Sequence, residues 1–237
     1  MTQAEIKALQ KELALLYQVA QAVSSYELDE VLREIVRIAG DLTQADSVLV
    51  YVVDKEAEEL VLRASQSPHA DLLQKIKMKM GEGITGWVAR ENKPVALAQG
   101  ANKDARFKYF RSLPEDRFEA FLSVPIISKR GVVGVINVQH KQPHAHTQME
   151  INLLAAVGKL VGGAVENALL IEETLALKEA LELRKLVEKA KGVLMKRRSL
   201  SETEAFKLLQ KESMDSRKSI KEVAEAILLM DKLSLKP

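Results

Sequence analysis

Basic side chains gather in residues 178–237 of this sequence, and the chemistry open to them is the neutralisation of phosphate groups. The candidates for such contacts form two groups: Lys191, Lys196, Arg197 and Arg198, then Lys211, Arg217 and Lys218. Arg can also stack on, or hydrogen-bond to, an unpaired base. Residues 178–237 hold 15 Lys and Arg against 10 Asp and Glu, whereas the preceding residues hold 20 against 23. The asymmetry favours a polyanionic partner for the tail, although any one of these residues could equally lie on a solvated helix face.

His140, His144 and His146 could also do chemistry, because imidazole is a common ligand of zinc, copper and iron. No carboxylate or other fourth ligand lies at a spacing typical of a metal-binding motif, so we expect an exposed loop and no metal site. The absence of cysteine excludes disulfides, thiolate metal sites and thiol nucleophiles. The sequence shows no set of nucleophile, base and orienting residue, and no Gly-rich phosphate loop of the Walker type. We therefore expect no catalytic residues and no enzyme.

Apolar periodicity predicts the elements that must position these groups. An opening helix has its apolar face at Ile6, Leu9, Leu13, Leu16, Ala20 and Val23, and a second helix at Leu28, Val31, Leu32, Ile35, Ile38, Ala39 and Leu42. β-Branched runs predict a hairpin from residues 47–53 and 60–64, and two more strands at 120–127 and 132–139. A short helix is predicted around 71–76, and a Gly-rich turn leads into another helix that Pro94 ends. Helices flanking an antiparallel meander make an α+β domain.

A long connecting helix is predicted to follow, opened by a capping box at Thr147-x-x-Glu150. Its apolar seam alternates between spacings of three and four: Leu154, Val157, Val161, Ala164, Ala168, Ile171 and Leu175. Gly158, Gly162 and Gly163 would allow the close approach of another helix. We expect this coiled-coil helix to pair with a second copy in a homodimer. The alternative is a monomer that folds the same seam onto its own domain.

The first two thirds of the chain carry motifs of a known sensory family. Met80-Gly-Glu-Gly-Ile-Thr-Gly-Trp-Val-Ala, then Ser123-Val-Pro-Ile and Gly134-Val-Ile-Asn-Val138, with this order of elements, resemble a GAF domain over roughly residues 10 to 170. The resemblance implies a ligand cavity between the sheet and the irregular loop at 99–119. The sequence does not identify a cofactor or the signal, which we expect to be a small molecule or a partner protein.

The tail carries a second set of motifs. Ala190-Lys-Gly-Val-Leu-Met-x-Arg, Ser201-Glu-x-Glu-Ala-Phe-x-Leu-Leu209, Arg217-Lys and Val223-Ala-x-x-Ile227 resemble an ANTAR domain across about residues 177 to 234. The resemblance implies a three-helix bundle that binds RNA hairpins in nascent transcripts and prevents transcription termination. This chain departs from the family at Ser213, where alanine is more common.

These features predict four parts: an N-terminal amphipathic helix at 1–25, a GAF-like core at 26–146, a connecting dimerisation helix at 147–180, and an ANTAR-like domain at 177–237. No apolar run approaches the roughly 20 residues of a membrane span, so we expect a cytoplasmic protein without a membrane partner. The predicted function is a signal-responsive, RNA-binding antitermination regulator. Two alternatives stay open: a DNA-binding regulator with a helix-turn-helix tail, and a GAF sensor whose tail only dimerises or docks a protein.

Overall fold

The computed structural model describes residues 14, 17–66, 72–110 and 117–234. The chain divides into two compact units, Met1–Ile171 and Glu172–Pro237. Each unit has its own hydrophobic core and is described by itself.

The first unit is built on a six-stranded antiparallel sheet in the order β3-β2-β1-β6-β5-β4. The strands are β1 (Ser47–Asp54), β2 (Glu59–Ser65), β3 (Lys77–Lys79), β4 (Val95–Leu97), β5 (Ala120–Ser128) and β6 (Gly131–His140). The predicted hairpin and the two later strands are confirmed. Strands β3 and β4 were not predicted, because three residues are too few to show a strand period.

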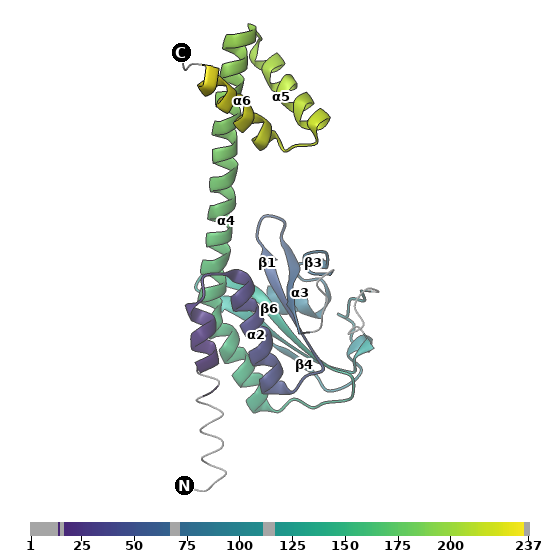
Figure 1. Cartoon of the computed structure of the whole chain (residues 1–237). Helices are drawn as coiled ribbons and strands as arrows, with labels where there is room; N and C mark the ends of the chain where they lie inside the picture. The colour runs from purple at the N-terminus through teal and green to yellow at the C-terminus, as the bar shows by residue number, and fades with distance from the viewer. Residues whose placement is uncertain (1–13, 15–16, 67–71, 111–116, 235–237) are drawn as a thin grey trace. The chain divides into compact units, whose positions relative to one another are not determined.

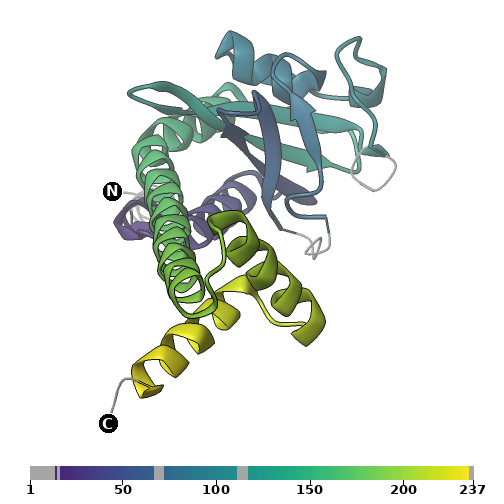
Figure 2. The same ribbon diagram turned by 90° about the horizontal axis from the view of Figure 1, so that it is seen from above.

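Helices cover both faces of this sheet, which confirms the predicted α+β class (Figures 1 and 2). On one face lie α2 (Leu28–Thr43) and the first turns of α4 (Gln148–Arg198), over a core that includes Ile35, Val50 and Ile136. On the other face lies α3 (Gly83–Glu91), which packs on a second core. The α2 face was predicted correctly: of its seven predicted apolar residues only Leu42 is partly exposed, and the rest are buried.

Two shorter segments were predicted as helices. In the N-terminal one, residues 17–24 are helical; Val19 and Ala22 are buried, whereas Ala20 and Val23, which the sequence placed on a seam able to pair with a second copy, are exposed. The predicted positions Ile6, Leu9, Leu13 and Leu16 lie outside the described residues. In the segment predicted as a helix at 71–76, residues 72–75 form turns instead, and Gln74 has a left-handed φ of 65° that an α-helix does not accommodate.

The predicted seam of α4 packs largely on its own domain. Leu154, Val157, Val161, Ala164 and Ala168 are all buried in the core beneath the sheet, whereas Ile171 and Leu175 are exposed. Gly158 and Gly162 allow close approach to strand β5 rather than to another helix, because a Cβ at these positions would overlap the carbonyl oxygens of Pro125 and Ile127. The expectation that this seam pairs with a second copy is therefore wrong up to Ala168.

This packing predicts opposite effects at two adjacent glycines. Gly162→Ala is expected to destabilise the first unit by about 1–3 kcal/mol, because backbone must shift to admit the methyl group. Gly163→Ala meets nothing within 4 Å and is expected to stabilise the helix by about 0.5–1 kcal/mol. Urea unfolding of both variants measures the difference, and equal effects would contradict the close approach.

By length and composition alone, α4 could span a membrane: an 18-residue window has a mean hydropathy of 1.5. The expectation that no apolar run approaches this length was too strict, because only Lys159 and Glu166 carry charge between residues 152 and 170. The same stretch buries its apolar face against the sheet, as the core helix of a globular domain does.

The loop with the histidines is exposed at residues 141–143, 145 and 147, as predicted, but its histidine side chains are not fully exposed. His140, at the end of β6, is only 6% exposed, and His144 and His146 are half-buried.

The second unit consists of the last part of α4 with α5 (Glu202–Ser216) and α6 (Ile220–Ser234). Capping boxes start both short helices: the Ser201 and Ser219 hydroxyls each bond the carboxylate three residues on, at Glu204 and Glu222. The core of this unit is formed by buried apolar side chains: Val187, Ala190, Leu194, Ala205, Leu209 and Ala224.

Candidate nucleic-acid interface

The predicted RNA-binding residues fall into two groups at opposite ends of α5. Lys196, Arg197 and Arg198 close α4 just before α5, whereas Arg217 ends α5 and Lys218 follows it (Figure 1). A helix of this length spans roughly 22 Å at 1.5 Å per residue. The structure therefore does not bring all of them into one compact patch.

Lys191 is held inside the module rather than displayed on its surface. Its side chain is only 9% exposed, and its Nζ lies 2.8 Å from carboxylate oxygens of both Glu188 and Glu202. The hydrogen bond to Glu188, together with that to Glu202, raises the pKa of Lys191. Lys191 therefore connects α4 to the start of α5, and we do not include it in the proposed RNA surface.

This position predicts that Lys191 affects folding more than RNA contact. Lys191→Met is expected to leave the slope of log affinity against log salt unchanged, because no phosphate contact is lost. In the same variant, the helix content of the tail should melt at a lower temperature. A slope that falls by about 1 would instead show that Lys191 neutralises a phosphate.

Arg197 also has a counterion, since its Nε lies 2.5 Å from Asp231 Oδ1 on α6 and its Nη2 donates to the Asp231 carbonyl at 3.2 Å. This ion pair joins the end of α4 to the end of α6. No sequence pattern indicates this pair, because the partners are 34 residues apart. Lys196 and Arg198 beside it are exposed.

The outward face of α5 carries further positive charge. At 100° per residue, Lys207 and Lys211 lie about 200° and 240° around the helix from the buried Ala205. Both are exposed, and Met214, one turn on, is 78% exposed. Lys207 was not among the predicted contacts, but its position one turn from Lys211 adds it to the same face.

The turn between α5 and α6 carries two further basic residues, Arg217 and Lys218. Arg217 has a left-handed φ of 55°, and both residues are exposed. Ser213 fixes the turn, because its Oγ donates to the Lys218 carbonyl at 2.6 Å while the Lys218 N–H donates to the Ser213 carbonyl at 3.1 Å. The serine that departs from the family pattern thus positions a basic residue, which an alanine could not do through a side-chain hydrogen bond.

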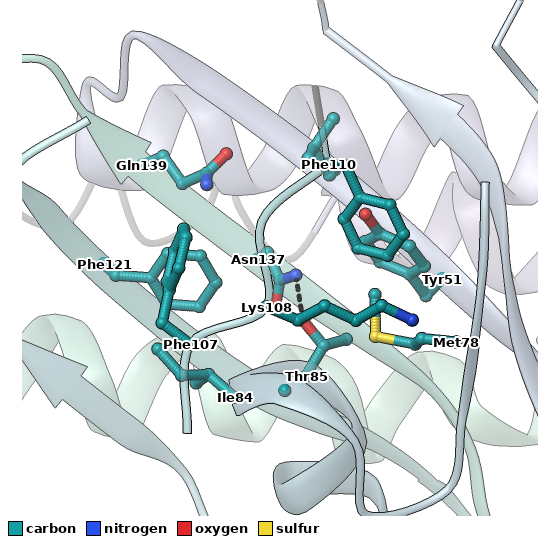
Figure 3. A pocket seen from close by; sticks show the side chains of 12 residues that line it. Tyr51, Met78, Ile84, Thr85, Phe107, Lys108, Phe110, Phe121, Asn137 and Gln139 are labelled. Atoms are coloured by element: carbon teal, nitrogen blue, oxygen red, sulfur yellow. Dashed lines mark hydrogen bonds between the residues drawn. The ribbon is translucent and has the colours of Figure 1, made fainter. Parts of the chain in front are cut away.

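In the first unit, a small cavity lies between the sheet, α3 and the loop after residue 100, where a ligand site was expected (Figure 3). Its volume is about 30 Å³, the space of one or two water molecules. Phe107, Lys108 and Phe110 of the loop line it together with Tyr51 and Phe121 of the sheet. In this closed form the cavity does not admit a metabolite.

Hydrogen bonds and an ion pair link several polar side chains at the floor and rim of the cavity. Asn137 donates to Thr85 Oγ1 and accepts from Ser123 Oγ, both at 2.7 Å, which links β5, β6 and α3 (Figure 3). At the rim, Lys108 Nζ lies 2.8 Å from Glu82 Oε1, and this hydrogen bond lowers the pKa of Glu82. One ion pair thus holds the loop against the start of α3.

Comparison with known families assigns both units. The GAF domain model matches residues 27–165, and the ANTAR domain model matches residues 175–228. The crystal structure of the GAF domain from Acinetobacter phosphoenolpyruvate-protein phosphotransferase superposes with a TM-score of 0.61 at 25% identity, covering 71% of this chain and 96% of that one.

Two curated relatives each match one part of the chain. The phosphoenolpyruvate-dependent phosphotransferase system protein of Escherichia coli is 33% identical over 112 residues, which cover 47% of this chain and 15% of that protein. The transcriptional regulatory protein PdtaR of Mycobacterium tuberculosis is 48% identical over 44 residues, which cover 19% of this chain and 22% of that protein. The similarity therefore spans less than a quarter of either relative.

Proposed function

We propose that this chain, which belongs to the GAF family and carries an ANTAR domain after its GAF domain, is a transcription antitermination regulator. In this proposal, the ANTAR domain binds RNA hairpins. The GAF domain receives a signal, and the ANTAR domain delivers the output to a nascent transcript.

The observation that carries the proposal is the basic face of the second unit. It consists of exposed cations along α5 and the turn after it: Lys207, Lys211, Arg217 and Lys218. Within the part of the chain that the structure describes, none of the four forms an ion pair. Such cations can exchange their counterions for phosphates, which is the main source of affinity for nucleic acid.

Arginine at the tip of this face favours RNA loops over duplex DNA. Sequence-specific RNA recognition targets unpaired bases, on which a guanidinium can stack. Arg217 sits in the tight turn between two capped helices, so its side chain projects from a fixed backbone. A helix-turn-helix would instead place the N-terminal residues of its second helix in the major groove. If α4 and α5 formed that pair, the first turn of α5 would present Glu202 and Glu204 to the DNA.

Pairing of two chains would present two such faces, as two RNA hairpins require. The exposed middle of α4 carries apolar side chains: Ile171, Leu175, Leu177 and Leu181. Every described residue from 170 to 182 is exposed, so these side chains do not belong to the core of either unit. A second copy of α4 would cover them in a coiled coil, and we include a homodimer in the proposal.

The GAF cavity supports a role in sensing, with a small molecule or a partner protein as the signal. Entry of a ligand would require the segment with Phe107, Lys108 and Phe110 to move away from α3, which breaks the Lys108–Glu82 pair. Ligand binding would thereby be coupled to the conformation of the loop.

Filter binding with a two-hairpin leader RNA tests the output. Affinity is expected to fall by about 100-fold between about 50 and about 200 mM salt, because several phosphate contacts are made. Duplex DNA of equal length should compete poorly. Indifference to RNA at low salt would overturn the proposal, and stronger competition by DNA would favour a DNA-binding regulator.

A further inference from the structure

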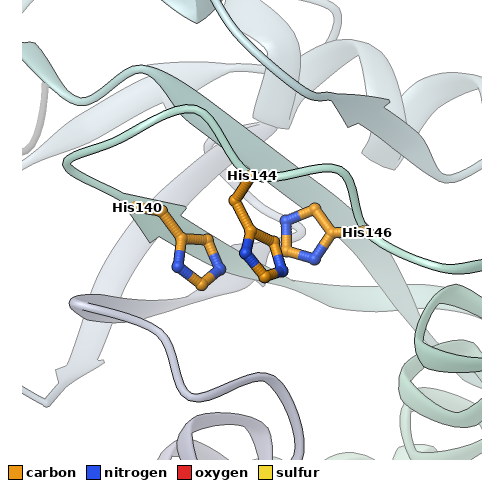
Figure 4. Close-up of side chains that lie close together, drawn as sticks. All are labelled: His140, His144 and His146. Atoms are coloured by element: carbon orange, nitrogen blue, oxygen red, sulfur yellow. The ribbon is translucent and has the colours of Figure 1, made fainter.

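The end of β6 and the loop behind it bring His140, His144 and His146 together (Figure 4). His140 is the last residue of β6, and the other two lie in the loop before α4. Backbone hydrogen bonds fix both sides of this loop: the His144 N–H donates to the Ala98 carbonyl at 2.9 Å, and the Thr147 N–H donates to Glu150 Oε2 at 2.7 Å. The three imidazoles therefore project from a positioned backbone.

The rings converge closely enough to share one ion. His140 stacks on His144 with centroids 4.0 Å apart, and the His146 ring lies 4.7 Å from His144 and 5.1 Å from His140. One ligand nitrogen from each ring lies within 4.8 Å of the others. Tetrahedral coordination at 2.0–2.1 Å places such nitrogens about 3.4 Å apart. Binding therefore requires the nitrogens to approach by about 1 Å and the stacked His140 and His144 rings, which lie 15° from parallel, to rotate until both lone pairs point at the ion.

Four ring nitrogens of the cluster are buried without a protein partner among the described residues. These atoms are His140 Nε2, His144 Nε2, and both Nδ1 and Nε2 of His146. A buried polar atom without a hydrogen bond costs about 1–3 kcal/mol, so a cluster of four is unfavourable for packing alone. A bound cation would satisfy the lone pairs of all three rings.

The charges around the cluster also suit a cation. Asp46 and Glu150 both act electrostatically on His140, and Glu150 also acts on His146. The fold thus brings Asp46 near the histidines, and Glu150 lies four residues after His146 in the sequence.

We propose that His140, His144 and His146 form a binding site for a divalent transition metal ion, with Zn²⁺ as the preferred occupant. Three histidines leave a fourth position open for water or another ligand. The ion would join the end of β6 to the loop that starts α4, and so stabilise the junction between the sheet and that helix.

Calorimetric titration of the full chain, produced without a polyhistidine tag and stripped with chelator, tests the site with ZnCl2. We expect one ion per chain with a Kd on the order of 1 μM or tighter, and a rise in Tm of about 5 °C at saturating zinc. Mg²⁺, which prefers oxygen ligands, should produce neither effect. Absence of zinc binding to the wild-type chain would overturn the proposal, whatever the variants show.

Variants at the loop positions locate the ion, because the nearly buried His140 is more important for packing. His144→Ala and His146→Ala should each weaken zinc binding by at least about 100-fold, since each removes one of three ligands. His69→Ala, at the remaining histidine of the sequence, serves as the matched control and should bind zinc as the wild type does. Retained binding in both loop variants would place the ion elsewhere and contradict the proposal.

Discussion

Reversing three charges on the basic face, in Lys211→Glu/Arg217→Glu/Lys218→Glu, is expected to weaken affinity for hairpin RNA by at least about 100-fold near physiological salt. All three side chains are exposed, and none lies in the core of the second unit, so the domain should fold normally. Each lost phosphate contact should lower the slope of log affinity against log salt by about 1, which gives a decrease of about 3 for the triple variant. Filter binding over a series of salt concentrations measures both quantities.

A matched control distinguishes the loss of phosphate contacts on α5 from the effect of a lower net charge on the whole protein. The exposed residues Lys55, Lys93 and Lys129 of the first unit, changed together to Glu, alter the net charge by the same amount. This control should keep most of the affinity, because its lysines lie far from α5 in the sequence and in a different compact unit. Equal losses in both triple variants would show that only the net charge of the protein matters, and would contradict an interface on α5.

Much of the fold could be predicted from the sequence, because a helix or strand that is buried on one face has apolar residues at a regular spacing. The α2 helix and the long strands have this signal over many residues, and the structure confirms them. In α4, the spacing of apolar residues correctly predicted a buried face. The same spacing does not distinguish a partner helix from the chain's own sheet, and Pro125 and Ile127 of the same domain lie where a second helix was expected.

The candidate interface was predictable in composition but not in geometry. Charge counting located the basic tail, yet it could not show that Lys191 is neutralised by Glu188 and Glu202, or that Asp231 pairs with Arg197. These pairings join different helices, so they depend on the packing of the module. The surroundings of the histidines depend on the packing in the same way, because Asp46 is distant in sequence from His140 but acts electrostatically on it in the fold.

The second large effect is expected on the middle of α4, where Leu177→Glu/Leu181→Glu should dissociate the proposed homodimer. Leu177 and Leu181 are 64% and 51% exposed in the single chain, and they lie one turn apart on one face of the helix. Their burial by a second copy would be lost, since the variant places four carboxylates in the interface of a dimer. Native mass spectrometry should then show a monomer where the wild type shows a dimer.

The same variant tests whether dimerisation serves RNA binding, because linking two sites raises affinity by about 10²-fold or more only when both sites are occupied. Affinity for a two-hairpin RNA should therefore fall by about 100-fold, while affinity for a single hairpin stays unchanged. The matched control is Ala176→Glu/Ala180→Glu, which introduces the same charges at the same spacing. Its side chains lie about 100° around the exposed helix from Leu177 and Leu181, so this variant should remain dimeric. If this control also became monomeric, the apolar stripe would not define the interface. If the leucine variant lost affinity for single hairpins as well, its defect would lie in the RNA-binding domain rather than in pairing.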